Sequence, residues 1–209
     1  MGVYNGRAFL ILGCLTALGL AACSGGGAVP SGAGGRSTLS AAKSLKCFTN
    51  DGGTCLIDKD GTVSLALPTP PPADAVAGVY FASDHSLNGT TLANLQAFKF
   101  TLNGPYQAGS PRASIPVTYN GVATHVWVYP QNCSFSSDFI HDSTVDPIDY
   151  PSSGNYCLEL QSAGGAYYSS WSTFVSDFGS AVISGPPDFL ADADNANGGN
   201  WTLTDIVVK

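Results

Sequence analysis

Charge is the property this sequence has least of. Only 11% of the 209 residues are Asp, Glu, Lys or Arg, and Glu159 is the sole glutamate. Eight basic residues stand against 15 acidic ones, for a formal net charge of −7. Proteins that bind nucleic acid need basic patches to neutralise phosphates. The composition therefore argues against a nucleic-acid partner.

Strong helix formers are scarce as well. Glu and Met occur once each and Lys is rare, whereas Gly alone accounts for 25 residues and Ser, Thr and Asn are abundant. This composition is typical of turns and strands rather than of helices. We expect an all-β protein, an antiparallel β-sandwich with one short helix.

The sequence also has no apolar run long enough to span a membrane, which takes about 20 residues. Its longest run, Ala8 to Leu20, has 13 residues and is followed by Leu20-Ala21-Ala22-Cys23. This tetrapeptide resembles the lipobox of bacterial lipoprotein precursors. The resemblance implies a signal peptide over residues 1–22, lipid on Cys23, and a protein anchored in the cell envelope outside the cytoplasm. The alternative is an ordinary secretory signal cut at a nearby small residue.

The mature chain then divides into a tether and a domain. Residues 23–40 are rich in Gly and Ser and carry no apolar periodicity. A coil of this length reaches about 20–25 Å, which would hold the domain near the membrane. The residue after Cys23 is Ser24 rather than Asp. In a Gram-negative cell, the absence of Asp at this position resembles lipoproteins sent to the outer membrane. Residues 41–209 are enough for one domain with a core.

Four cysteines remain in this domain: Cys47, Cys55, Cys133 and Cys157. An even number in an exported chain indicates two disulfides, and three pairings are possible. Proximity in the sequence favours Cys47–Cys55 and Cys133–Cys157. A zinc site would want Cys-x-x-Cys spacing, which the sequence lacks.

Alternating apolar residues predict the strands of the sandwich. In residues 95–102, Phe98, Phe100 and Leu102 share one face, while Lys99 and Thr101 share the other. Further strands are expected at 62–67, 77–83, 113–117, 123–129, 157–160, 181–184, 189–192 and 201–208. The Pro-rich segment 68–72 is expected to be a stiff crossing within one domain.

One short helix is expected at Trp171, Phe174, Val175 and Phe178, which recur at i, i+3, i+4 and i+7. Ser170 is suited to its N-cap and Gly179 to its C-terminal end.

The sequence between Cys133 and Cys157 is polar and shows no period, so we expect a long irregular loop. Its ionisable residues are Asp138, His141, Asp142, Asp146 and Asp149. Function commonly lies in loops carried by a rigid scaffold. Asp138, Asp142 and Asp146 are the candidate ligands for calcium, which takes six or more oxygens. The alternative is that these acids are simply solvated.

Segments across residues 95–208 resemble secreted jelly-roll sandwiches related to carbohydrate-binding modules. The resemblance rests on residues 108–115 (Ala-Gly-Ser-Pro-Arg-Ala-Ser-Ile), on Val126 to Tyr129, on Thr173 to Phe178, and on the final strand from Gly199 to Val208. Ala113 departs from the pattern, which has an aromatic residue after Arg112. The resemblance implies a jelly-roll fold, but the group it points to has no defined activity.

Two sets of aromatic residues are candidates for ligand binding. His125, Trp127 and Tyr129 share one face of a predicted strand, where they could form a platform that stacks on sugar rings. The alternative is that a second layer covers this face. Tyr167 and Tyr168 are expected to be exposed, whereas Trp171 is assigned to the core of the helix.

Motifs of catalysis are missing. The sequence has no Gly-x-Ser-x-Gly, no His-Glu-x-x-His, no phosphate-binding loop and no dinucleotide fingerprint. A Ser-His-Asp triad depends on geometry, which the sequence does not reveal. We therefore expect a non-catalytic, lipid-anchored module that binds carbohydrate or another envelope polymer and needs no cofactor other than calcium. A structural or protein-interaction lipoprotein is the first alternative, and a secreted hydrolase the second.

Overall fold

The strands bury every second side chain, as the period of two in the sequence predicts. The computed structural model describes residues 45–81, 86–152 and 154–209. In β5 (Phe98–Pro105), Phe98, Phe100 and Leu102 are fully buried, while Lys99 and Thr101 are partly exposed. The predicted signal peptide, the lipidation site Cys23 and the tether lie outside the described residues.

The described strands form two antiparallel sheets. The larger sheet runs in the order β1 (Lys46–Asn50), β4 (Val76–Tyr80), β12 (Asp188–Asp192), β6 (Arg112–Tyr119), β7 (Val122–Tyr129), β9 (Cys157–Leu160), β10 (Tyr167–Tyr168), and β11 (Val182–Ile183) also pairs with β6. The smaller sheet runs β2 (Thr54–Ile57), β3 (Val63–Leu67), β13 (Gly199–Val208), β5, β8 (Phe139–Val145). The helical segments are α1 (Trp171–Phe178) and two single turns, η1 (Leu92–Asn94) and η2 (Gln161–Ala163).

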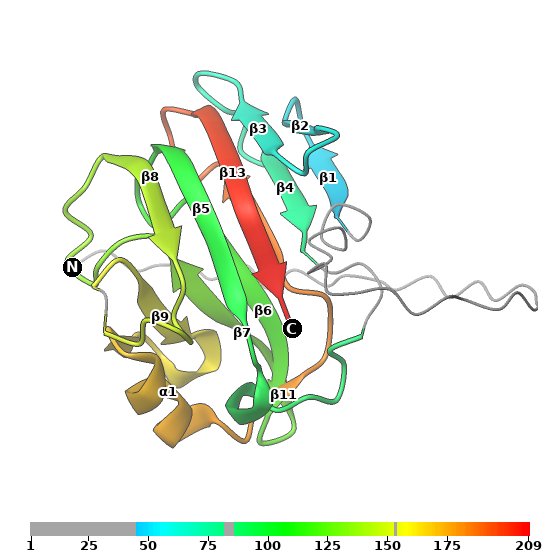
Figure 1. Ribbon diagram of the computed structural model, residues 1–209. Helices are drawn as coiled ribbons and strands as arrows, with labels where there is room; N and C mark the ends of the chain where they lie inside the picture. The colour runs from blue at the N-terminus through cyan, green and yellow to red at the C-terminus, as the bar shows by residue number, and fades with distance from the viewer. Residues whose placement is uncertain (1–44, 82–85, 153) are drawn as a thin grey trace, which may run out of the picture. The chain divides into compact units, whose positions relative to one another are not determined.

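The strands that make up the centre of the sandwich are nested in their pairing (Figure 1). In chain order β3 pairs with β13, β4 with β12, β5 with β8 and β6 with β7. Among these eight strands, taken in chain order, each strand lies in the other sheet from the one before it, except that β6 and β7 form a hairpin within the larger sheet. This arrangement is the jelly roll, and the predicted fold class is confirmed.

The core lies between the two sheets and is mainly aromatic and aliphatic. Phe81, Phe98, Phe100 and Phe189 pack against one another with ring centroids 5.3–6.5 Å apart. Trp201 is 1% exposed and its indole Nε1 donates a hydrogen bond to the Pro105 carbonyl at 2.6 Å. Burial on this scale is the main source of stability for such a domain.

Both predicted disulfides are present, Cys47–Cys55 and Cys133–Cys157. The Cys47–Cys55 disulfide joins β1 of the larger sheet to β2 of the smaller one. The turn between these two strands likewise crosses from one sheet to the other. The Pro-rich segment crosses between the sheets as well, from β3 to β4, as predicted. Disulfides persist in oxidising compartments, so the pair indicates an extracytoplasmic environment. No helix in the described part of the chain is long and apolar enough to cross a membrane.

The segment between Cys133 and Cys157 is not irregular throughout, and this prediction is wrong. It contains β8, which pairs with β5 along the edge of the smaller sheet. The pairing register shifts between Leu102 and Gly104, and Asp142 in β8 has a positive φ of 41°. These irregularities interrupt the alternation of buried side chains, so the strand shows no clear period of two.

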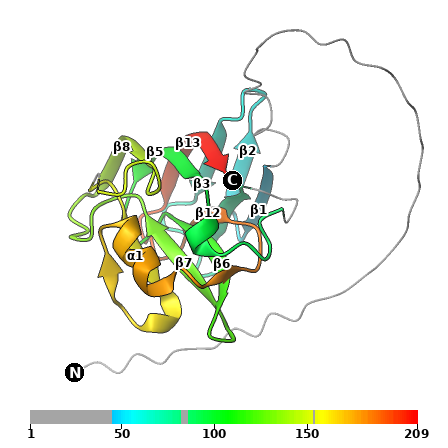
Figure 2. The same ribbon diagram turned by 60° about the horizontal axis from the view of Figure 1, so that its bottom comes forward.

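The helix occupies the predicted residues, with Ser170 at its N-cap position and Gly179 at its C-cap position as expected, but Ser170 does not cap it through its side chain. It packs against β9 and β10, beside the larger sheet in both ribbon views (Figure 1, Figure 2). The Ser170 hydroxyl does not cap the helix; it hydrogen bonds to the Ser172 hydroxyl at 2.9 Å. Instead the Tyr156 hydroxyl accepts the Trp171 N–H at 3.1 Å. Gly179 ends the helix in a right-handed conformation, with a φ of −61°.

Candidate functional site

A cavity of about 360 Å³ opens at one end of the sandwich. Four segments far apart in the sequence build it: the connection between β5 and β6, the end of β7, the loop before β8, and β10. The Tyr106 N–H donates to the Asp138 carbonyl at 2.9 Å and so joins two of these segments. The lining residues are Tyr106, Gln107, Ala108, Gly109, Tyr129, Phe135, Ser137, Asp138 and Tyr167. Its volume lies within the range of small-molecule binding sites.

Three aromatic rings form one wall of this pocket. Tyr129, Phe135 and Tyr167 meet edge to face, with ring centroids 5.1–6.1 Å apart. Tyr129 is 8% exposed and lies at the base, whereas Tyr167 is 50% exposed. Phe135 has a positive φ of 49°, a conformation rare for a bulky residue. A large aromatic side chain held this way on a pocket wall is typical of a functional site.

Buried polar groups stand behind the aromatic wall. Tyr106 is 3% exposed, and its buried hydroxyl makes no hydrogen bond of good geometry with described residues, although the Gln131 side chain lies close enough to affect it. Gln131 Nε2 likewise makes no hydrogen bond with described residues, and Gln131 Oε1 accepts the Ser137 N–H at 3.0 Å. Burial raises the pKa of Tyr106 to about 12, against the opposing effects of Gln131 and Arg112. The hydroxyl therefore stays protonated, and a ligand atom would reach it only after a shift of the side chains that cover it.

Carboxylates dominate the charge around the pocket. Asp138 lines it, and Glu159 Oε2 accepts the Tyr129 hydroxyl at 2.7 Å. Burial and the nearby Glu159 raise the pKa of both Tyr129 and Tyr167. Burial is the larger cause of both shifts; Glu159 adds to it because a neighbouring negative charge opposes formation of a second one, while Arg112 opposes the shift at Tyr129.

Arg112 supplies little free positive charge to this region. Its Nη2 lies 2.6 Å from Asp192 Oδ2, and its Nη1 lies 3.4 Å from Asp194 Oδ2. Nη1 also donates to the Gly109 carbonyl at 3.1 Å. These bonds tie the start of β6 to β12 and to the pocket loop. Arg112 belongs to residues 108–115, which resemble a segment of the jelly-roll modules, and its bonds thus hold the pocket loop in place.

The predicted platform of His125, Trp127 and Tyr129 does not form an open surface. The His125 ring stacks on Trp127 at 5.2 Å, and the Arg112 guanidinium lies 4.7 Å from the centre of the indole. In the β6–β7 register His125 and Arg112 flank Trp127 on opposite sides along the strands. Both faces of the indole are therefore in contact with protein. Of the three residues, only Tyr129 lines the pocket.

Tyr167 and Tyr168 have different environments, because successive residues of a strand point to opposite faces. Tyr167 belongs to the pocket. Tyr168 packs on Phe174 and Phe178 of the helix, and its hydroxyl donates to Asp177 Oδ2 at 2.9 Å. It is half-buried, so the predicted exposure holds for Tyr167 alone.

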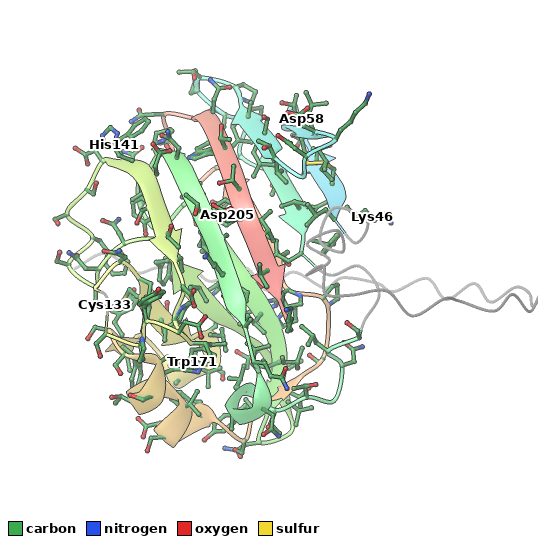
Figure 3. All side chains as sticks on the ribbon, viewed as in Figure 1. Lys46, Asp58, Cys133, His141, Trp171 and Asp205 are labelled. Atoms are coloured by element: carbon green, nitrogen blue, oxygen red, sulfur yellow. A yellow bond between two sulfur atoms is a disulfide. The ribbon has the colours of Figure 1, made fainter. Side chains whose placement is uncertain are left out.

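The structure does not bring the predicted calcium ligands together. Asp138 precedes β8, Asp142 lies within it and Asp146 follows it, and eight extended residues span about 26 Å. Asp142 Oδ1 accepts Asn103 Nδ2 at 2.9 Å, and Asp146 Oδ1 accepts the Asp149 N–H at 3.1 Å. Residues 45–81, 86–152 and 154–209 contain no group of three or more His, Cys, Asp or Glu that could hold an ion. His141 and Cys133 are likewise well apart (Figure 3).

A serine, a histidine and an aspartate do meet on the outer face of the larger sheet. Ser114 Oγ lies 2.9 Å from His125 Nδ1, and Asp188 is the register partner of Ser114 on β12. Ser114 is only 1% exposed, however, and no hydrogen bond between described residues joins Asp188 to His125. A nucleophile must reach its substrate. The arrangement fits a serine that orients the His125 ring.

Asp188 is expected to make stability depend on pH. One of its carboxylate oxygens is buried without a partner, and burial raises its pKa to about 7 despite Arg112. Because this pKa lies above the unfolded value of about 4, the folded state binds more protons between the two. Stability is therefore favoured below pH 4 and lost as the pH rises through 7.

We expect Asp188→Asn to remove this loss of stability with pH. The free energy of unfolding of the variant, relative to that of the native protein, should therefore increase by about 2 kcal/mol between pH 4.5 and 8. Urea unfolding of both proteins at the two pH values measures the difference. The His125 titration is common to both and cancels. Asp205→Asn, at an exposed position, is the control. An advantage that is the same at both pH values would contradict the prediction.

Sequence reasoning singled out Tyr129, Asp138 and Tyr167 but missed other parts of the pocket, notably Tyr106, Phe135 and Gln131. None of these belongs to a motif, and Tyr106 and Phe135 stand outside the predicted strands. The sequence feature that indicated this region was the predicted Cys133–Cys157 disulfide, because it closes the loop that carries Phe135 and Asp138.

The comparisons with known proteins add no family to this picture. No model of a protein family matches the chain, and no curated protein matches its sequence.

Proposed function

We propose that this protein is a non-catalytic binding module of the cell envelope whose pocket takes a sugar unit of a carbohydrate or related polymer. The observation that carries the proposal is the pocket itself: a half-exposed Tyr167 beside Phe135, on a lining that also includes Tyr106 with its buried hydroxyl. Aromatic rings stack on the apolar C–H faces of sugars, and a buried donor fixes a sugar oxygen. The combination of apolar wall and few polar groups is typical of ligand sites.

The lipid anchor is part of the same proposal. The resemblance of Leu20-Ala21-Ala22-Cys23 to a lipobox, together with two disulfides in the domain, supports an exported chain held on a membrane through Cys23. The short tether would then keep the pocket within reach of polymers at the envelope surface. In a Gram-negative cell the outer membrane is the site that Ser24 favours.

The experiment is a glycan-array screen of the full-length protein, purified in detergent from an oxidising compartment. We expect saturable binding to a restricted set of glycans. A protein shown to be folded and oxidised that binds nothing on the array would refute carbohydrate binding. The structural or protein-interaction lipoprotein would then be the better hypothesis.

Tyr106→Phe gives the sharpest test of the pocket. The Tyr106 hydroxyl makes no hydrogen bond of good geometry in the free protein, so we expect its removal to change stability by well under 1 kcal/mol. Loss of its hydrogen bond to the ligand should weaken binding about tenfold. Calorimetric titration with an array hit and thermal unfolding measure the two effects.

Tyr119→Phe is the matched control. Tyr119 ends β6, seven residues from Arg112 and hence at the far end of the strand from the pocket. Its hydroxyl donates only a long bond to the Asp177 carbonyl at 3.5 Å. Equal affinity of Tyr106→Phe and the native protein would exclude this pocket as the binding site.

A further inference from the structure

We infer that the pocket selects a positively charged sugar unit, one that carries a free primary amine, over its neutral and acidic counterparts. The inference rests on the proposed function, because it names the class of ligand for the same pocket. It follows from the distribution of charge, from the exposed aromatic side chains on the lining and from the buried Tyr106 hydroxyl.

Acidic side chains outnumber basic ones around the pocket, where Arg112 is the one basic residue of the described chain that acts on Tyr106 and Tyr129. Asp138 lines the pocket and Glu159 lies directly behind Tyr129. Arg112 is nearby, but Asp192 and Asp194 already neutralise it. A ligand with a carboxylate or a sulfate would meet uncompensated acids here, whereas an ammonium group would be attracted.

The remaining basic residues of the described chain stand on other elements. Lys46 lies on β1, at the edge of the larger sheet opposite β10, and is labelled in Figure 3 on the far side from Cys133. Lys59 is in the turn between β2 and β3, and Lys99 is on β5. Lys209 is bound through its backbone to Ala97 at the chain end. None of them lines the pocket.

The aromatic wall suits an ammonium group for a second reason. Cations are attracted to the faces of aromatic rings, and Tyr167 and Phe135 present their rings to the pocket, Tyr167 with half of its surface exposed. The carboxylate of Asp138 lies on the same lining and can accept a hydrogen bond from the amine. Charge-assisted hydrogen bonds of this kind are about twice as strong as neutral ones.

A bare amine would leave the Tyr106 hydroxyl unused, because an ammonium group offers no acceptor. An amino sugar carries hydroxyl and ring oxygens beside its amine, and one of these can accept the Tyr106 hydrogen. The same ring has C–H groups that pack on the aromatic wall. A deacetylated hexosamine unit therefore meets all three features of the pocket together, and its N-acetylated form lacks the charge.

The test compares two tetrasaccharides with the same sugar backbone, a glucosamine tetramer with free, charged amines and an N-acetylglucosamine tetramer in which each amine is a neutral amide. The full-length protein in detergent is titrated with each at pH 6, where amines of this kind are protonated. We expect the charged tetramer to bind at least about tenfold more tightly, with a preference that falls as salt is raised. A neutral glucose tetramer should bind no better than the acetylated one.

Asp138→Asn identifies the carboxylate responsible. We expect it to reduce binding of the glucosamine tetramer by about tenfold and to leave binding of the N-acetylglucosamine tetramer unchanged. Asp205→Asn lowers the net negative charge by the same amount from the exposed side of β13, marked in Figure 3, and should change neither.

The outcomes separate the two levels of the hypothesis. If the acetylated or the glucose tetramer binds as tightly as the charged one, or if Asp138→Asn weakens all of them equally, the selection for charge is overturned while the carbohydrate pocket stands. If none of these tetramers binds and the array is also negative, the proposed function fails and this inference with it.

Discussion

Replacing Trp201 by alanine is expected to lower the free energy of unfolding by about 3–5 kcal/mol, a loss typical of large aromatic residues in cores. Trp201 is among the largest fully buried side chains, and its Nε1 hydrogen bond to the Pro105 carbonyl would also be lost. Domains of this kind have only about 5–15 kcal/mol of stability. The variant should therefore be partly unfolded or close to it.

The surroundings of Trp201 leave little room for the structure to relax. Gly104, with a φ of 154°, faces the indole so closely that a Cβ there would collide with Trp201 Cδ1. The backbone of β5 thus packs directly on the ring. A cavity between strands that are hydrogen bonded on both sides cannot collapse easily, which puts the cost near the upper end of the range.

Urea unfolding followed by far-ultraviolet circular dichroism measures the loss. Thr202→Ala is the control, since the next side chain of β13 is exposed and its truncation should cost well under 1 kcal/mol. A Trp201→Ala protein less than about 1 kcal/mol below the native one would contradict the burial described here.

Removal of the Cys133–Cys157 disulfide is expected to affect stability and binding together. The bond closes a loop of 24 residues, and a cross-link of this span contributes about 3 kcal/mol, chiefly by restricting the unfolded chain. It also ties the loop that carries Phe135, Ser137 and Asp138 to β9. We expect Cys133→Ala/Cys157→Ala to lose most of its glycan affinity even under conditions where the fold persists.

Cys47→Ala/Cys55→Ala is the matched control for this variant. Its disulfide spans only 8 residues and joins β1 to β2, neither of which contributes to the pocket. We expect a smaller loss of stability and unchanged binding. Thermal unfolding and titration with the same glycan test both proteins. If the two double variants lost affinity equally, the Cys133–Cys157 disulfide would not act through the pocket loop.

The regular strands and the helix could be predicted because their signals are local. In β5 the alternation of Phe98, Phe100 and Leu102 with polar residues identifies a half-buried strand without knowledge of its partners. The Asn120-Gly121 pair likewise predicts the β6–β7 hairpin, since both residues adopt positive φ. β8 was missed because its register shift breaks the period on which such predictions depend.

The pocket could be predicted only in part, because it depends on contacts between distant segments. Tyr106, Tyr129, Asp138 and Tyr167 come together through the nested pairing of strands. Trp127 shows the opposite case: its position on the strand beside His125 suggested a free platform, and only the pairing of β6 with β7 places Arg112 against its ring as well.

By itself the sequence determined the all-β class, most of the strands and the helix, and it favoured the cysteine pairing that the structure contains, since composition, periodicity and short separations act over a few residues. The tertiary structure decided which side chains line a cavity, which acids remain apart and which polar groups are buried without partners. These properties depend on packing between segments separated by tens of residues. For that reason Tyr106, which belongs to no motif, becomes the residue on which the proposed function is most directly tested.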